Sequence, residues 1–364
     1  MKAGIVGLPN VGKSTLFNCL SNAKAQSANF PFCTIEPNIG VVNVPDSRLA
    51  KLEELVNPER VMPATVDIVD IAGLVRGASK GEGLGNQFLA NIRETDAIIH
   101  VLRCFDNDNI VHVDTTVDPV RDKETIDIEL QLKDLESLEK RLERVKKTAR
   151  TGNKEAQKEL EVLERVLKGL EESKSVRALE FTDKEREEII QPLQFITDKP
   201  VLYVCNVDEA AAVSGNDYVA AVQEAVKDED AEVIILAVGV EADITELETF
   251  EEREMFLDDL GLTEPGSSVL IRSAYKLLNL QTYFTAGEKE VRAWTINIGD
   301  TAPQAAGVIH TDFEKGFIRA EVIAYSDYVS YGSEAKVKEA GKMRVEGKEY
   351  IVKDGDVMHF RFNV

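Results

Sequence analysis

Residues 7–14, which read GLPNVGKS, have the types and spacing of a phosphate-binding loop. They match the pattern G-x-x-x-x-G-K-[ST], with an apolar strand-like run before them and a helix-like run from Thr15 after them. Glycines let backbone N–H groups point at phosphate oxygens, and the N-terminus of the next helix adds partial positive charge. We therefore expect Lys13 to reach the β- and γ-phosphates of a nucleotide and the Ser14 hydroxyl to ligate Mg²⁺.

A second group of residues has the types expected around a γ-phosphate. The apolar run 65–70 ends in Asp70, where an acid would hold Mg²⁺ through water, and Gly73 follows it. A glycine can offer its backbone N–H to the γ-phosphate because no side chain intrudes. Thr34 lies twenty residues beyond Ser14. It is either a second Mg²⁺ ligand from a switch segment or an ordinary loop threonine.

The segment 74–85 predicts a mobile switch loop, because it holds four glycines within nine residues. Leu74 occupies the place of the glutamine with which Ras-like GTPases orient the attacking water. An apolar side chain cannot orient water, so unaided hydrolysis should be slow or use another group. Asn10 is one candidate, since an asparagine at this place can ligate K⁺ between phosphates, unless it serves turn geometry. The other is His112, in an expected loop after the strand-like run 98–103.

Residues 206–209, which read NVDE, stand where GTPases carry the guanine-reading motif N-K-x-D. In that motif the aspartate accepts hydrogen bonds from guanine N1–H and the 2-amino group, and the lysine stem lies along the ring. Here Val207 follows Asn206 in place of the lysine, and Glu209 is one methylene longer than the aspartate. Adenine lacks the two donors that the aspartate reads, so the change removes the bias against ATP. ATP is favoured over GTP as the nucleotide.

Alternating short apolar runs and amphipathic runs predict an α/β fold with a mostly parallel sheet over residues 1–120 and 191–277. The expected strands are Ala3–Val6, Ile39–Val44, Thr65–Asp70, Ile98–Arg103, Val201–Asn206 and Val233–Val238.

The segment 121–190 predicts an inserted antiparallel helical hairpin with a seam like that of a coiled coil. The apolar residues at helical spacing are Ile128, Leu132, Leu135, Leu138, Leu142 and Val145, then Leu160, Leu163, Leu167 and Leu170 after the turn-like run 151–153. Two interpretations stay open. The leucines can simply pack on each other beneath solvated charges, or the hairpin can be an arm that docks on a partner.

Residues 278–364 predict a separate small α+β domain. Strand-like runs at Val291–Ile298, Arg319–Ala324, Glu349–Val352 and Val357–Phe362 surround one helix that begins near Pro303. Asp354-Gly355-Asp356 marks a turn before the last strand.

Composition places the chain in the soluble globular class, with 43% hydrophobic and 30% charged residues and no apolar run long enough to span a membrane. Its four cysteines (Cys19, Cys33, Cys104 and Cys205) form no C-x-x-C pair, which argues against a zinc site or a disulfide framework and favours the cytosol. The net charge of −22 alone argues against nucleic-acid binding. However, segments 121–190 and 278–364 each carry only −2.

Together these residues resemble the Obg-like ATPase (YchF) family, within the Obg group of P-loop translation-factor GTPases. The resemblance spans the chain: residues 7–15, 70–85 and 206–209, the hairpin, and a C-terminal TGS domain of β-grasp fold. One segment departs from the family pattern. Relatives usually carry a small S-A or C-A pair that contacts the base from its other edge, whereas residues 237–241 here read AVGVE. At this edge a backbone N–H is the group left to contact the base.

The resemblance implies a monomeric ATPase that hydrolyses ATP to ADP with Mg²⁺ and associates with ribosomes. It implies Ser14 and Thr34 as Mg²⁺ ligands and Val207 against the adenine. Around the phosphates it implies Asn10, Val11, Gly12, Lys13, Ser14 and Thr15. A nucleotide-dependent switch in translation or stress response follows, in which phosphate state biases how the hairpin and TGS domain meet ribosome or RNA.

Three other function classes stay open. The protein could be a GTPase with atypical base recognition, in which Glu209 shifts to read guanine. It could be a nucleotide-sensing RNA- or ribosome-binding protein with little turnover. A P-loop small-molecule kinase is the fourth class, but the TGS segment and the glycine-rich switch have no use in one. Six basic residues at 336–353 are interleaved with acidic ones, so charge alone does not identify a partner.

Overall fold

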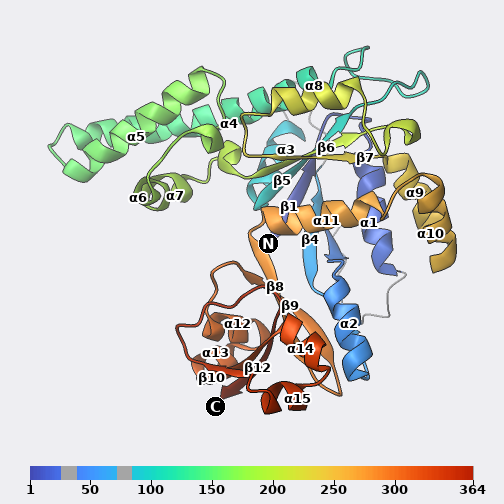
Figure 1. Ribbon diagram of the computed structural model, residues 1–364. Coiled ribbons are helices and arrows are strands. Elements are labelled where there is room, and N and C mark those ends of the chain that lie inside the picture. The colour runs from blue at the N-terminus through green and yellow to red at the C-terminus, as the bar shows by residue number, and fades with distance from the viewer. Residues whose placement is uncertain (26–38, 72–83, 364) are drawn as a thin grey trace. The chain divides into compact units, whose positions relative to one another are not determined.

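The computed structural model describes residues 1–25, 39–71 and 84–363, which form two compact units (Figure 1). The first unit comprises Met1–Gly40 and Asp67–Leu270, and the second comprises Val41–Val66 and Ile271–Val364. Each is described by itself below.

The first unit is built on a six-stranded sheet with the order β2-β4-β1-β5-β6-β7. Its strands are β1 (Lys2–Val6), β2 (Ile39–Asn43), β4 (Thr65–Asp70), β5 (Ala97–Arg103), β6 (Val201–Asn206) and β7 (Glu232–Leu236), of which residues 41–43 of β2 and 65–66 of β4 are assigned to the second unit. The pairs β1–β4, β1–β5, β5–β6 and β6–β7 are parallel. All seven residues of β5 and all six of β6 are buried. Continuous apolar runs form these strands because helices cover both faces of such a sheet.

Helices of the first unit flank this sheet, with α1 packed on β1 and α9, and α4 packed on β5 and α8 (Figure 1). They are α1 (Lys13–Ala25), α3 (Leu84–Arg93), α4 (Pro119–Ala149), α5 (Lys154–Glu171), α8 (Asp217–Ala225), α9 (Val238–Glu246), α10 (Phe250–Asp259) and α11 (Gly266–Leu277), the last crossing into the second unit. Short turns complete the unit: η2 (Val176–Ala178), α6 (Asp183–Glu185), η3 (Arg186–Ile190), α7 (Gln191–Leu193), η4 (Ile196–Asp198) and η5 (Glu209–Ala211). The α/β fold expected from the sequence is confirmed.

The predicted hairpin is present as α4 and α5, which pack antiparallel and extend away from the sheet (Figure 1). Asp118 caps the N-terminus of α4, and Asn153 caps that of α5 after a turn in which Gly152 has φ +85°. The hairpin core contains Leu138, Leu142, Val145, Leu163, Val166 and Leu170, joined by Val176, Ile190 and Phe195 from the returning segment.

The predicted stripe on α4 is wrong at its first two positions. Ile128 and Leu132 are 49% and 43% exposed, whereas Ile126 and Leu130 are buried. Helix α4 has 31 residues and α5 has 18, so α5 covers only the later part of α4. The first turns of α4 pack on the sheet unit instead, and a different face is buried there.

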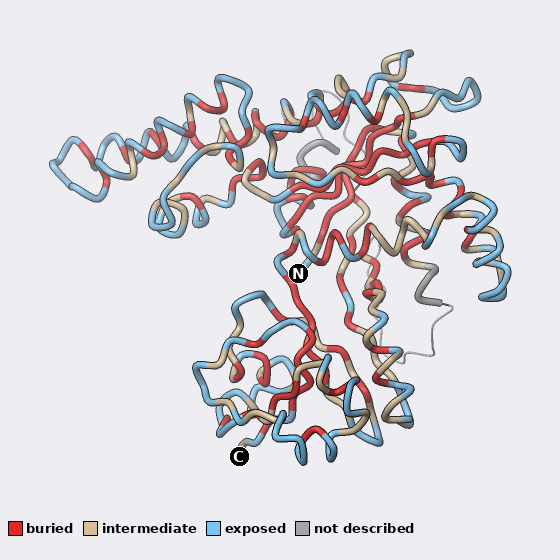
Figure 2. Tube along the Cα trace, viewed as in Figure 1, coloured by how far each residue is buried: buried red, intermediate tan, exposed pale blue. Residues whose placement is uncertain are grey.

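The second unit holds another six-stranded sheet, with the order β11-β10-β12-β8-β9-β3. Its strands are β3 (Val61–Met62), β8 (Leu280–Ala286), β9 (Val291–Asn297), β10 (Phe317–Ala324), β11 (Arg344–Glu346) and β12 (Asp356–Phe362). Its helices are α2 (Ser47–Val56), α12 (Ala302–Ile309), α13 (Thr311–Lys315), α14 (Tyr325–Tyr331) and α15 (Glu334–Glu339). Buried positions lie along the strands of both units, and the outer faces of the helices are exposed (Figure 2).

The C-terminal prediction holds for three strands and for the helix near Pro303, but residues 349–352 are not a strand. Ile351 makes only an isolated bridge with Thr301. The run was misjudged because one alternation of apolar side chains does not show whether a neighbouring strand exists. Helices α13, α14 and α15 and strands β8 and β11 were not predicted.

Residues 41–66, which the sequence assigned to the nucleotide-binding domain, belong to the second compact unit. Strand β3 pairs with β9, and Arg48 of α2 makes an ion pair of 2.7 Å with Asp354. Contacts distant in sequence decide this membership. The functional domain boundaries at 120, 190 and 277 stay a prediction.

The three cysteines that the structure describes, Cys19, Cys104 and Cys205, are buried and free; Cys33 lies outside the described residues. Within the described part of the chain, no helix is long and apolar enough to cross a membrane.

Candidate nucleotide-binding site

The phosphate loop joins β1 to α1 and takes a conformation that requires its glycines. Gly12 has φ +100°, and a Cβ there would lie 2.5 Å from Asn206 Nδ2. A Cβ on Gly7 would lie 2.6 Å from the Val101 carbonyl oxygen. Asn10 adopts the left-handed region at φ +62°, which asparagine tolerates better than most residues. The loop therefore follows the path that the sequence pattern predicted.

Lys13 is buried at the start of α1, and its Nζ donates to the Leu8 carbonyl at 2.7 Å. Burial lowers the pKa of Lys13 to about 8, although the nearby Asp70 acts in the opposite direction. A phosphate group offers this ammonium the charged oxygens that its buried position lacks.

Ser14 and Asp70 lie together, as the sequence predicted for a Mg²⁺ site. The Ser14 hydroxyl donates to Asp70 Oδ2 at 3.4 Å. Asp70 Oδ1 is buried and has no hydrogen-bond partner within the described residues. Burial raises the pKa of Asp70, while Lys13 and Ser14 oppose that shift. A hydroxyl and an unpartnered carboxylate oxygen are ligands that Mg²⁺ prefers, so the residues present fit this ion.

Three predicted site residues, Thr34, Gly73 and Leu74, lie outside the described residues. Their predicted roles as a Mg²⁺ ligand, a γ-phosphate donor and the replacement of a water-orienting glutamine stay predictions.

Asn206 ties the base-reading segment to the phosphate loop. Its Nδ2 donates to the Val11 carbonyl at 2.9 Å, and its Oδ1 accepts from the Val238 N–H at 3.1 Å. The side chain therefore joins the ends of β1, β6 and β7, where a parallel sheet places its ligands.

A hollow of about 530 Å³ opens beside Asn206. Its lining includes Asn10, Gly12 and Thr15 on the phosphate side, Val207, Asp208 and Glu209 after β6, and Ala237 to Val240 after β7. Asp208 caps the turn η5, since its Oδ1 accepts from the Ala211 N–H at 3.0 Å, while Glu209 is exposed. The structure thus brings the predicted phosphate and base residues to one hollow.

The atypical segment 237–241 forms the N-terminus of α9, which begins at Val238. Backbone N–H groups of this first turn are the donors available at the base edge. The Glu241 side chain is engaged elsewhere, accepting from the N–H groups of Gly266 at 2.7 Å and Ser267 at 3.1 Å.

Sequence reasoning missed the loop after β5 as a wall of the hollow, where Phe105, Asp106, Asn107 and Ile110 line it. Arg103 holds this loop by donating to the carbonyls of Phe105, Asn107 and Ile110 at 3.1, 3.1 and 2.9 Å. The available signal was position: the loop follows a central buried strand at the carboxyl edge of the sheet.

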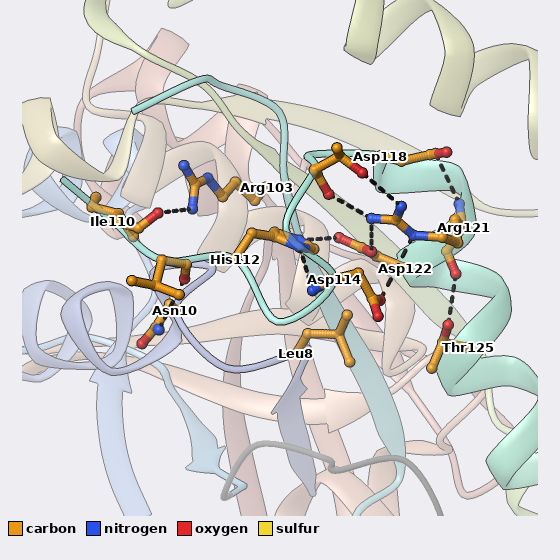
Figure 3. Close-up of polar contacts among 12 residues, drawn as sticks. Leu8, Asn10, Arg103, Ile110, His112, Asp114, Asp118, Arg121, Asp122 and Thr125 are labelled. Atoms are coloured by element: carbon orange, nitrogen blue, oxygen red, sulfur yellow. Dashed lines mark hydrogen bonds and ion pairs between the residues drawn. The ribbon is translucent and has the colours of Figure 1, made fainter. Parts of the chain in front are cut away.

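His112 lies in the same loop, close in sequence to a contact with the phosphate loop (Figure 3). Asn10 Nδ2 donates to the Val111 carbonyl at 3.1 Å. The His112 ring points to α4, where its Nε2 lies 2.8 Å from Asp122 Oδ2 (Figure 3). Asn10 and His112, the two candidates for the hydrolysis step, are therefore linked through one residue.

Comparisons with known proteins agree with this architecture. A family model described as "50S ribosome-binding GTPase" matches residues 2–134. The model YchF-GTPase_C, described as a protein of unknown function, matches residues 280–363.

Full-length relatives are similar throughout. The chain is 59% identical over 363 residues to a Haemophilus ducreyi protein named ribosome-binding ATPase YchF, covering 100% of this chain and 99% of that protein. A Bacillus subtilis protein of the same name is 56% identical over 366 residues, covering 100% of both. The solved YchF GTPase of Schizosaccharomyces pombe is 40% identical with a TM-score of 0.90, covering 99% of this chain and 97% of that one. The chain therefore belongs to the YchF family of P-loop nucleoside triphosphate hydrolases.

Proposed function

We propose that this protein hydrolyses ATP to ADP and phosphate with Mg²⁺ and acts as a nucleotide-dependent switch on the ribosome, in translation or stress response. The hollow beside the phosphate loop carries the proposal, because it is walled by Val207 and Glu209 instead of a guanine-reading lysine and aspartate. Relatives named ribosome-binding ATPase support both the nucleotide and the partner.

Affinity for ATP and GTP analogues that resist hydrolysis tests the base preference. Calorimetry on the nucleotide-free protein at equal Mg²⁺ should give at least tenfold tighter ATP binding, which is about 1.4 kcal/mol. Preference for GTP would leave a GTPase with an unusual base reader, the alternative that the "GTPase" in three of the matched names favours. Equal binding would point to residues 237–241 as the place where selectivity is lost.

A motif-restoring variant gives the matched control. Val207→Lys combined with Glu209→Asp rebuilds N-K-x-D on the same strand end. GTP affinity should rise in this variant while the phosphate loop is untouched, because an aspartate again accepts from guanine N1–H and the 2-amino group. An unchanged ratio of affinities would show that these positions do not read the base.

Lys13, Ser14 and Asp70 supply the phosphate and metal side of the proposal. Ser14, with Asp70 acting through water and Thr34 as a further ligand, would hold Mg²⁺, which when bound neutralises charge on the β- and γ-phosphates. Lys13 would leave the Leu8 carbonyl to reach the same phosphates. Removing Mg²⁺ with a chelator should abolish phosphate release, and turnover that persists would contradict the assignment.

His112 is our proposed group for orienting the attacking water, since Leu74 cannot do so. Its neighbour Val111 contacts Asn10, which supports a location within reach of the phosphates. His112→Ala should lower single-turnover ATP hydrolysis by about 100-fold, in the range of general acid–base effects, while ATP affinity stays unchanged. Leu74→Gln tests the same question, since a restored glutamine should make hydrolysis less dependent on His112.

The tip of the hairpin is our proposed contact with ribosomal RNA. Residues 144–158 carry six basic residues and one acidic residue in a chain of net charge −22. All six basic residues (Arg144, Lys146, Lys147, Arg150, Lys154 and Lys158) are exposed. Arg144 lies about 15 Å further along α4 than Asp134, which accepts from the Ile196 N–H in the turn η4 that leads into β6. That exceeds the Debye length of about 8 Å, so the acidic sheet unit does not cancel the field of the tip.

RNA fits this tip better than a protein surface does. The apolar residues of the segment, Val145, Ala149 and Ala156, are all buried, so the tip offers no anchor for a protein interface. Phosphate contacts need only exposed cations, and they make binding salt-dependent. The expected C-terminal TGS contact with RNA has a mixed surface and rests on the family resemblance alone.

Co-sedimentation with ribosomes tests the tip. Arg144→Glu with Arg150→Glu and Lys154→Glu should weaken binding at least tenfold and flatten its salt dependence. Lys336→Glu with Lys338→Glu and Lys342→Glu makes the matched charge change in the C-terminal domain. Stimulated ATP turnover by ribosomes separates a switch from a protein that only senses nucleotide, which should release no additional phosphate.

A further inference from the structure

Both ring nitrogens of His112 are engaged by its own surroundings (Figure 3). Nε2 lies 2.8 Å from Asp122 Oδ2, and Nδ1 accepts the Asp114 N–H at 3.1 Å. Because Nδ1 accepts a hydrogen bond, the proton of the neutral ring is on Nε2 and is donated to Asp122. The two side chains are 3% and 1% exposed. In this arrangement neither ring nitrogen is free to face water or the phosphate loop.

The loop around His112 is fixed at one end and strained at the other. Arg103 donates hydrogen bonds to the carbonyls of Phe105, Asn107 and Ile110. Beyond His112, Thr115 has φ +70°, a left-handed conformation that is rare for a β-branched residue. Such strain costs about 1–3 kcal/mol and persists only where surrounding contacts enforce it. The buried His112–Asp122 contact and two hydrogen bonds from Arg121 to Thr116, at 2.6 Å to its carbonyl and 3.0 Å to its hydroxyl, are the contacts that enforce it.

The same loop exposes two apolar side chains. Val111 is 75% exposed, and its neighbour Val113 is also exposed. Val111 is in addition the residue whose carbonyl accepts from Asn10 of the phosphate loop. A movement of this loop would relieve Thr115, give Val111 and Val113 a chance of burial, and free the His112 ring.

We propose that Asp122 is a positioning residue that stores His112 in a resting place and so holds back ATP hydrolysis until the loop moves. This rests on the proposed role of His112 in hydrolysis. Two parts of the protein are connected to the His112–Asp122 contact. Asn10 reaches the loop from the phosphate side, and Asp122 itself lies in the first turns of α4, the helix that leads to the hairpin tip. A partner bound at the tip can thereby act on the stored histidine.

The rate of ATP turnover in the absence of ribosomes tests whether Asp122 holds His112 in an inactive position. Asp122→Ala should raise kcat severalfold with KM for ATP unchanged, and Asp122→Asn should raise it less, since its amide oxygen still accepts from Nε2. The gain must disappear when Asp122→Ala is combined with His112→Ala. Asp118→Ala is the matched control. It removes a carboxylate from the same turn and the N-cap of α4, and Asp118 makes no contact with His112.

A second measurement tests the position of His112 without measuring ATP turnover. Diethyl pyrocarbonate modifies accessible neutral imidazole nitrogens, and mass spectrometry locates the product. His112 should react slowly in the wild-type protein and at least tenfold faster in Asp122→Ala, while the exposed His310 reacts equally in both. The comparison also guards against a variant that unfolds, because unfolding would accelerate His100 as well, which is buried in the sheet.

The outcomes separate the two proposals. Lower kcat in Asp122→Ala would mean that Asp122 orients His112 productively, which overturns storage and leaves the role of His112 intact. Rapid modification of His112 in the wild-type protein would also overturn storage. Wild-type turnover in His112→Ala would overturn the proposed role of His112 in hydrolysis, and with it the control by Asp122.

Discussion

The phosphate loop and the polar cluster beneath α4 are both largely buried, but the chain builds them in opposite ways. The loop takes its donors from eight consecutive residues. The second group, which we name the α4 base cluster, consists of Lys123, Asp127, Arg177, Tyr203 and Glu229. The loop is poised for a ligand, whereas the cluster pairs its cations with its own carboxylates.

Contacts within the α4 base cluster show this internal pairing. Glu229 accepts from Lys123 at 2.7 Å, from Tyr203 at 2.9 Å and from Arg177 at 3.5 Å. Burial alone would lower the pKa of Lys123, but Asp127 and its other partners raise it. In the phosphate loop, burial prevails and the pKa of Lys13 falls to about 8. A buried lysine that lacks anionic partners indicates a binding site, whereas a buried lysine with several anionic partners indicates a structural contact.

The largest effect should come from Lys13→Ala. Losing a buried cation that would contact two phosphates should weaken ATP binding by about 3–5 kcal/mol, with no loss of stability. Calorimetry with a non-hydrolysable analogue and urea unfolding measure the two quantities. Lys174→Ala, which removes an exposed cation paired with Glu172, is the control and should change neither. A destabilised Lys13→Ala protein would break the comparison.

Glu229→Ala should show the opposite pattern. It leaves Lys123 and Arg177 short of their shared anion, so the free energy of unfolding should fall by about 2–4 kcal/mol. ATP affinity should change less than twofold. Glu224→Ala, which removes the exposed partner of Lys227, should cost under about 0.5 kcal/mol. Equal losses in the two variants would show that the cluster carries no special stability.

Acid should destabilise the α4 base cluster through His100, whose ring packs beside Tyr203 at 5.6 Å. Burial, together with the cations of Lys123 and Arg177, lowers the pKa of His100 to about 3. Below the pKa of about 6.5 that His100 has in the unfolded chain, the unfolded state binds a proton and the folded state does not. The free energy of unfolding therefore falls as pH drops toward 3.

His100→Phe keeps a ring at this position but cannot titrate. The slope of unfolding free energy between pH 6 and pH 4 should decrease by up to about 1.4 kcal/mol per pH unit in this variant. Stability above pH 7 should hardly depend on pH in either protein through this group. A slope identical in both would exclude His100 as the source.

The smallest effect concerns the exposed face of α4 above the cluster. Ile128→Gln combined with Leu132→Gln should change stability by less than about 0.5 kcal/mol, because both side chains are already in contact with solvent. Leu138→Ala, in the hairpin core, should cost about 2–5 kcal/mol. Thermal unfolding of both variants distinguishes them, and comparable losses would restore the single stripe that periodicity predicted.

Local patterns were enough for the elements whose chemistry is local. Strands β4 and β6 begin and end at the predicted residues. In β6, which is buried throughout, the signal is a continuous apolar run, and in β4 apolar residues alternate with polar ones. The phosphate loop was predictable for the same reason, since its glycines, Lys13 and Ser14 are contiguous. Asn206 and Val207 could be assigned to the base-reading motif because that motif directly follows a strand, and the apolar run before Asn206 predicts this strand.

Tertiary structure alone decided the features that depend on what lies opposite. Whether Ile128 is buried depends on where α5 ends, and whether residues 349–352 form a strand depends on a neighbour that is absent within the described residues. The same holds for the placement of 41–66, the wall formed by Phe105 and the partner of His112. Hydrophobic periodicity indicates that one face of a helix or strand is apolar. It does not indicate what packs on that face, because the packing partners are distant in sequence and only the fold brings them close.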